Sequence, residues 1–80
     1  MTHTPNTVDK VRAMMTRNQL NQSQMARLLG VPQGTIGNWL GGTRQPNQVV
    51  TRFVAVLEEA ELFHQTLFKR LLVQALKPAA

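Results

Sequence analysis

Few side chains in this 80-residue sequence have the types and spacing of a catalytic or metal site. Glu61 and His64 form a Glu-x-x-His motif, which contributes ligands to the di-iron sites of helical bundles. Such a site needs two of these motifs and two further carboxylates, so one chain with one motif falls short. A serine triad would have to use Ser23 and Asp9, the only serine and aspartate, and Ser23 is expected in the first turn of a helix. The sequence therefore predicts no catalytic residue, no metal ligand and no cofactor, and we expect Glu61 and its acidic neighbours to form a solvated surface.

Size and composition also argue against an enzyme. A chain of about 9.0 kDa makes one domain with a marginal core, which leaves little room for a deep active-site cavity. The absence of cysteine excludes disulfides, thiolate zinc sites and a thiol nucleophile. No apolar run approaches the ~20 residues of a membrane span, and no signal-peptide pattern opens the sequence. These features predict a cytoplasmic protein without a membrane partner.

The positive charge is concentrated in the first two-thirds of the chain. The formal net charge is +5, and residues 1–52 contain six of the nine Lys and Arg residues against one of the four acidic residues. Residues 53–80 contain three cations and three acids, so this part is neutral. A polyanion such as nucleic acid is the natural partner for the basic part, although the same charge also suits an ordinary basic surface.

Apolar periodicity predicts helices at both sides of a short polar break. Apolar residues recur at helical spacing from Val8 to Met15, and a loop is expected around Leu20. Asn21, with a glutamine three residues later, resembles the capping box that begins a helix, and Gly30 is the usual residue at a left-handed helix end. Pro32 suits the entrance of the next helix.

The second half of the chain continues the helical pattern. Asn47 is expected to cap a fourth helix with a broad apolar face that includes Val49, Phe53 and Ala60, and a fifth helix follows to Pro78. No segment alternates long enough for a strand. The sequence predicts an all-α bundle of about five short helices, divided into a tail (1–7), a helix-turn-helix domain (8–60), a C-terminal helix (61–77) and a tail (78–80).

The segment 22–40 has the features of a helix-turn-helix, in which two short helices are joined by a glycine-containing turn. Ala26 is small where two helices must approach closely, and Gly30 allows the sharp turn. Ile36 and Trp39 are spaced to anchor the second helix in the core. This register leaves the other face of the second helix exposed.

These residues resemble a known family. The run from Leu20 to Val31, the Ile-Gly-Asn-Trp of residues 36–39 and the Gly-x-Arg-x-Pro of residues 42–46 are similar to the XRE-type helix-turn-helix of phage Cro proteins, phage repressors and small bacterial regulators and antitoxins. The resemblance covers residues 8–60. It departs from the family at Pro32, where Ser or Thr usually caps the recognition helix, at Leu40, where Glu is frequent, and at Gly34, which replaces a frequent base-reading residue.

The resemblance implies the residues that contact DNA. Base contacts in the major groove are expected from the recognition helix, namely Gln33, Gly34, Thr35 and Asn38, and Gln33 has the chemistry for a bidentate contact to adenine. Phosphate contacts are expected from Gln22, Thr43 and Arg44, with Arg17 and Arg27 as peripheral partners.

The last helix has a wider apolar stripe than one neighbouring helix can cover. It either closes the core of the domain or forms a subunit interface, in which case Leu67, Phe68, Leu71 and Leu72 would lie nearest the two-fold axis. We therefore expect a nucleoid-associated homodimer that binds a two-fold-symmetric operator in double-stranded DNA, most simply as a phage or mobile-element repressor. An antitoxin that also binds a toxin or other phage protein, and an adaptor that does not bind DNA, remain the alternatives.

Overall fold

The computed structural model describes residues 6–77, and within them the chain folds into five α-helices without a strand. They are α1 (Thr7–Asn18), α2 (Gln22–Leu29), α3 (Gln33–Leu40), α4 (Gln48–Phe63) and α5 (Gln65–Leu76). The all-α prediction of five short helices is confirmed. The tail predicted at 78–80, and residues 1–5 of the other predicted tail, lie outside the described part of the chain.

Short-range capping interactions set the helix boundaries. The Asn21 side chain accepts a hydrogen bond from the Gln24 backbone N–H, and the Gln24 side chain accepts one from the Asn21 N–H, which forms the predicted capping box. Asn47 caps α4 through the Val50 N–H as expected. Gly30 ends α2 with a φ of 73°, a left-handed conformation that favours glycine.

All five helices contribute to one apolar core. Ala26 is almost fully buried, which fits its predicted place at a close helix approach, and Ile36 and Trp39 fix α3 to the domain as expected. The helices place in this core the apolar side chains of Val11, Met14, Met25, Leu28, Leu29, Ile36, Trp39, Val54, Leu57, Ala60, Phe68 and Ala75.

The C-terminal helices differ from the sequence-based expectation in two respects. Helix α4 continues to Phe63 and the break falls at His64, three residues beyond the boundary predicted at 61. The predicted apolar face of α4 is also too broad, because Val49 and Phe53 are exposed to solvent. A 16-residue helix that packs on one side has room for apolar residues on its other side, and single-chain periodicity does not say which set is buried.

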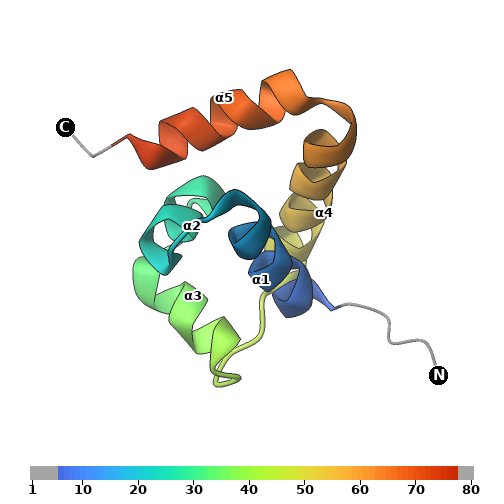
Figure 1. Cartoon of the computed structure of the whole chain (residues 1–80). Coiled ribbons are helices and arrows are strands. Elements are labelled where there is room, and N and C mark those ends of the chain that lie inside the picture. Colours follow the sequence, from blue (N-terminus) through green and yellow to red (C-terminus); the bar gives the residue numbers. More distant parts are fainter. Residues whose placement is uncertain (1–5, 78–80) are drawn as a thin grey trace.

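Helix α5 closes the domain. It folds back from the elbow at His64 and packs against α2 and α4, with Phe68 and Ala75 facing the core. Figure 1 shows α5 across one end of the molecule, whereas α3 and the loop that follows it lie at the other end. No helix in residues 6–77 has the length and apolar character needed to cross a bilayer.

Candidate nucleic-acid interface

The unit formed by α2, a three-residue turn and α3 exposes one face of α3 to solvent. At the turn, the Val31 N–H donates to the Ala26 carbonyl at 3.0 Å, and Val31 is half-buried at the inside of the corner. Ile36 and Trp39 hold the opposite side of α3 in the core. The outward side of α3 is therefore available to a partner.

Glycine occupies most of this outward side. Gly34, Gly37 and Gly41 recur at spacings of three and four residues, so they lie on one face of α3. A Cβ at Gly34 would meet nothing within 4 Å, which confirms that this position is open. Only two of the predicted base-contacting side chains, Gln33 and Asn38, are fully exposed, and they flank the glycines.

The fourth predicted base contact, Thr35, is half-buried on the other flank of α3. It lines a shallow groove of about 200 Å³ between α3 and the loop before α4, together with Trp39 and Arg44. The structure therefore brings Thr35 close to the loop that follows α3, rather than to the middle of the glycine face.

Gln22 lies across the start of the exposed face. It is the first residue of α2, and its Oε1 atom is 3.2 Å from the position that a Cβ on Gly37 would occupy. The absence of a side chain at Gly37 thus leaves room for the Gln22 side chain to lie against α3. Backbone N–H groups at a helix N-terminus and the Gln22 amide are both suited to an anionic oxygen.

The loop after α3 is tied back to the helix through Asn38. The Asn38 carbonyl accepts hydrogen bonds from the backbone N–H groups of Thr43 (3.0 Å) and Arg44 (3.3 Å). The Thr43 hydroxyl donates to the same carbonyl (3.2 Å) and to the Asn38 side-chain oxygen (3.3 Å). This leaves the Asn38 NH₂ group as a donor facing solvent, and it fixes Arg44, which is exposed, beside the C-terminal end of α3.

Arg17, a predicted phosphate contact, is instead engaged within the protein. Its Nη2 and Nε atoms donate to the two oxygens of Glu61 at 2.6 and 3.1 Å, and the Asn18 amide donates to Glu61 at 2.8 Å. The hydrogen bond from Arg17 holds the pKa of Glu61 below its ordinary value, although burial of the carboxyl opposes this, and the same pair raises the pKa of Arg17. The expectation of a solvated Glu61 is therefore wrong, because the carboxylate joins α1 to α4.

Arg27 has a structural role as well. Its guanidinium donates to the carbonyl oxygens of Ala75 (3.2 Å) and Lys77 (3.3 Å) at the C-terminus of α5 and to the Ser23 hydroxyl (3.4 Å). A cation at this end of a helix satisfies carbonyls that have no partner within the helix. The structure thus does not bring Arg17 or Arg27 to the face of α3.

A different arginine reaches that end of α3. Arg12, from α1, donates to the Leu40 carbonyl at 3.4 Å, next to the loop that contains Arg44. Arg12 is not among the contacts expected from the sequence, because its place in α1, 28 residues before Leu40, gives no sequence signal of this proximity. Arg12 and Arg44 are the cations that the structure places nearest to the exposed end of α3.

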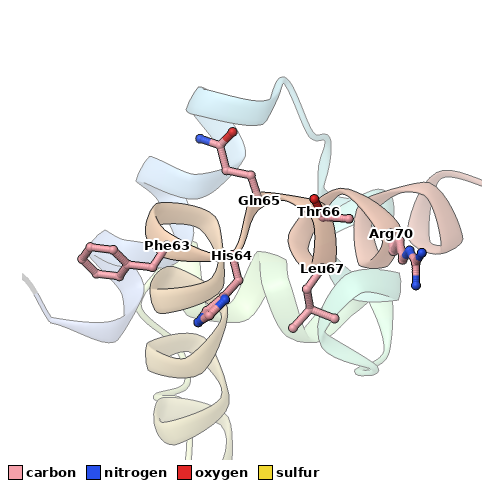
Figure 2. Close-up of a pocket in the computed structure, with 6 residues that line it drawn as sticks. All are labelled: Phe63, His64, Gln65, Thr66, Leu67 and Arg70. Carbon is pink, nitrogen blue, oxygen red and sulfur yellow. The ribbon is translucent and has the colours of Figure 1, made fainter.

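The four residues predicted at a dimer interface do not share one environment. Phe68 is buried in the core, Leu71 and Leu72 are half-buried against it, and Leu67 is exposed. Leu67 lines an open groove of about 480 Å³ at the elbow between α4 and α5. Figure 2 shows Leu67 and His64 directed to one side of this elbow, Gln65 to the other, and Phe63 away from both.

The residues described here contain no group of three or more His, Cys, Asp or Glu side chains that could hold a metal ion. Comparisons with protein-family models, with curated proteins and with solved structures found no match to this chain. What the protein does must therefore be inferred from its own residues and fold.

Proposed function

We propose that this protein is a sequence-specific DNA-binding transcriptional regulator that inserts α3 into the major groove. The observation that carries the proposal is the exposed face of α3, around which Gln22, Asn38 and Arg44 gather from three successive segments of the chain. The resemblance of residues 20–46 to the XRE-type helix-turn-helix supports the same assignment. The major groove of B-DNA admits an α-helix and presents a distinct pattern of donors and acceptors for each base pair.

The glycine face suggests how α3 approaches the bases. Without a side chain at Gly34, the helix backbone can come closer to the floor of the groove there than an ordinary recognition helix. Gln33 and Asn38 then read base edges from the two flanks, because an amide can both donate to and accept from adenine. Sequence preference should be concentrated at the few base pairs under these two side chains.

Phosphate binding would come from the edges of the same face. Arg44 lies in the loop after α3 and Arg12 beside it, while Gln22 and the first N–H groups of α2 lie at the other edge. Contacts on both sides of a helix fix its orientation in the groove without sequence discrimination. Occupation of promoter DNA that blocks polymerase is the simplest regulatory mechanism for such a protein.

Selection of bound sequences from random double-stranded DNA, followed by titration of a labelled site, tests the proposal. If Arg12 and Arg44 from two subunits contact phosphates, the slope of log K against log salt concentration should be about −4. Arg44→Ala should weaken binding to all sequences alike. Arg70→Ala is the matched control, because Arg70 is an exposed arginine on α5 at the other end of the molecule.

Gln33→Ala separates base reading from phosphate binding. It should relax the preference at one base pair of each half-site and cost ~1–3 kcal/mol per lost bidentate contact. An unchanged selected sequence would show that Gln33 does not face the bases. No enrichment from the random pool, together with affinity that is independent of salt, would contradict DNA binding itself.

A second candidate is an antitoxin, which binds both its promoter and a toxin. The observation that favours it is the outer surface of α5, where Leu67, Val73 and Leu76 are exposed beside three cations, Lys69, Arg70 and Lys77, that make no ion pair within residues 6–77. Co-purification with the product of a neighbouring toxin-like reading frame would support this candidate. If the protein binds DNA but its gene has no neighbouring toxin-like reading frame, this result would count against the antitoxin.

A further inference from the structure

Helix α4 has a second apolar face that the domain core does not use. Val49, Val56 and Phe63 recur every seven residues and have exposed fractions of 77%, 61% and 70%. Phe53, 39% exposed, lies between the first two, four residues after Val49 and three before Val56. We call these four residues the α4 seam. The core face of the same helix consists of Val54, Leu57 and Ala60, and Ala60, 4% exposed, takes up the next position along the line of the seam, so the seam is interrupted between Val56 and Phe63.

This spacing is that of a helix that packs against another helix. Alternating steps of four and three residues place apolar side chains along one line of a helix, where they fit between the side chains of a partner helix. The seam runs over 15 residues, from Val49 to Phe63, and therefore about 21 Å. Within the described part of the chain, Val49, Val56 and Phe63 remain largely open to solvent and Phe53 partly so, which leaves room for a helix from another molecule.

The charges beside the seam indicate which helix that is. Arg52 and Glu59 are exposed, lie seven residues apart on the same side of the seam, and make no ion pair within residues 6–77. If two α4 helices pack antiparallel with Phe53 of one copy against Val56 of the other, Arg52 of one copy comes opposite Glu59 of the other, and the pair forms twice by symmetry. In a parallel pair, Arg52 would instead face Leu57, which lies in the core and offers no carboxylate.

We propose that a second copy of this chain docks on the α4 seam, antiparallel, with the two-fold axis between Phe53 and Val56 and the Arg52–Glu59 pairs at the edge of the interface. The interface is isologous, so each seam is both the donor and the recipient surface. It replaces the surface expected on α5, since Phe68 is already committed to the core. The inference supplies the second subunit that a two-fold operator requires, but it is independent of DNA and is tested without it.

Sedimentation of the full chain over a range of concentrations provides the first test. A seam of two heptads is short, so we expect a monomer–dimer equilibrium in about the micromolar range. Val56→Glu brings two like charges together near the axis and should raise the dissociation constant at least tenfold. Ala55→Glu is the matched control, because it adds the same charge at the neighbouring exposed position of α4, off the seam. Circular dichroism and thermal melting of both variants check that the helical fold is retained.

The charge pairs and the axis allow two further tests of orientation. Arg52→Glu and Glu59→Arg should each weaken the dimer, and the double variant should restore it. Because the chain contains no cysteine, Val56→Cys gives a single thiol, and this thiol should form an intermolecular disulfide under mild oxidation. Val73→Cys, on exposed α5, should not do so at the same protein concentration.

Three results would overturn the proposal. One is a protein that stays monomeric at every concentration. Another is a dimer that Val56→Glu leaves intact and Leu67→Glu disrupts, which would place the interface on α5. The third is a dimer in which the double charge reversal is no better than the single ones, which would exclude this antiparallel arrangement. A wild-type chain that dimerises through the α4 seam but binds no DNA would count against the proposed function alone.

Discussion

The pair formed by Arg17 and Glu61 shows how one carboxylate connects distant parts of the chain. The two residues are 44 positions apart, and the Glu61 side chain is largely shielded from solvent while it accepts hydrogen bonds from Arg17 and Asn18. Hydrogen bonds that involve charged groups are stronger than those between neutral ones, although the half-exposed Arg17 reduces the net effect. This carboxylate should therefore contribute more to stability than the other acidic residues of α4.

Glu61 should also make the stability of the protein depend on acid pH. Because its pKa is lower in the folded than in the unfolded chain, the stabilisation is fully present above the unfolded value of ~4.3 and is lost as the pH falls through the lower folded value. We expect Glu61→Gln to cost about 1–2 kcal/mol near pH 7 and to reduce the loss of stability between pH 5 and pH 3. Urea denaturation across this pH range measures both effects.

The control for this prediction is Glu59→Gln, because Glu59 is exposed and makes no ion pair within residues 6–77. It should change neither the free energy of unfolding of the monomer nor its acid dependence. If Glu61→Gln and Glu59→Gln gave the same pH profile, the Arg17 pair would not contribute to stability in solution.

Sequence reasoning could not have assigned Arg17 correctly. On one helix, opposite charges three or four residues apart indicate an ion pair, but Arg17 and Glu61 lie on helices that meet only in the folded chain. Arg27 is a similar case, since the carbonyls that it binds belong to α5. Core residues were easier to identify, because the spacing of Ile36 and Trp39 determines which way they face whatever α3 packs against.

Glycine has opposite roles at the end of α2 and inside α3. Gly30 has a φ of 73°, which costs an L-residue roughly 1–2 kcal/mol, whereas Gly34 has an ordinary helical conformation with open space around it. We therefore expect Gly30→Ala to destabilise the domain by about 1 kcal/mol and Gly34→Ala to stabilise it by about 0.5–1 kcal/mol. Thermal melting of the two variants at one pH gives both signs in a single comparison.

The effect of Gly34→Ala on DNA affinity should be opposite to its effect on stability. Gly34→Ala adds a methyl group to the glycine face of α3, which would hold the helix away from the groove, so a more stable protein should bind its site less well. Stabilisation without loss of affinity would show that α3 does not need a bare surface at residue 34.

At the level of helices, the sequence contains the local signals that set helix boundaries, but it contains no signal of the tertiary contacts between helices. The boundaries at Asn21, Gly30 and Asn47 follow from side chains and backbone groups within three or four residues, so the sequence predicts them directly. The break at His64 has no glycine or proline to mark it and depends on α5 turning back over α2 and α4. The two apolar faces of α4 were merged for the same reason, since only packing shows which one the domain buries.

The distribution of charge over the molecule also changes on folding. In the sequence, the excess lies entirely in residues 1–52, but Lys10 pairs with Glu58 and Arg17 pairs with Glu61, so acidic residues of α4 neutralise cations of α1. The exposed cations without an ion pair in residues 6–77 therefore include Arg44 near α3, Arg52 beside the α4 seam, and those on the outer surface of α5. Charge counts along the chain therefore do not give the distribution of unpaired cations over the folded surface.

A symmetric dimer on DNA should depend on the distance between its two half-sites. If the α4 seams hold two subunits together, the two α3 helices can enter successive major grooves on one face of the duplex only when the half-site centres are about 10 base pairs apart. We expect the selected site to be an inverted repeat with this spacing. Inserting five base pairs between the half-sites turns one of them to about the opposite face, so binding should fall to the affinity of a single half-site.

The variant Val56→Glu distinguishes this mechanism from two independent monomers. As a monomer, it should bind each half-site with the affinity that the wild-type protein has for a single half-site. The inserted base pairs should not change this affinity. Quantitative titration of both proteins on the original and the spaced operator measures the difference. If wild-type protein tolerated the insertion, the subunits would not be rigidly joined through α4. If Val56→Glu lost affinity for an isolated half-site, the substitution would have altered the DNA-binding unit. The spacing experiment is then carried out with the Arg52→Glu variant, which leaves the apolar side chains of the seam unchanged.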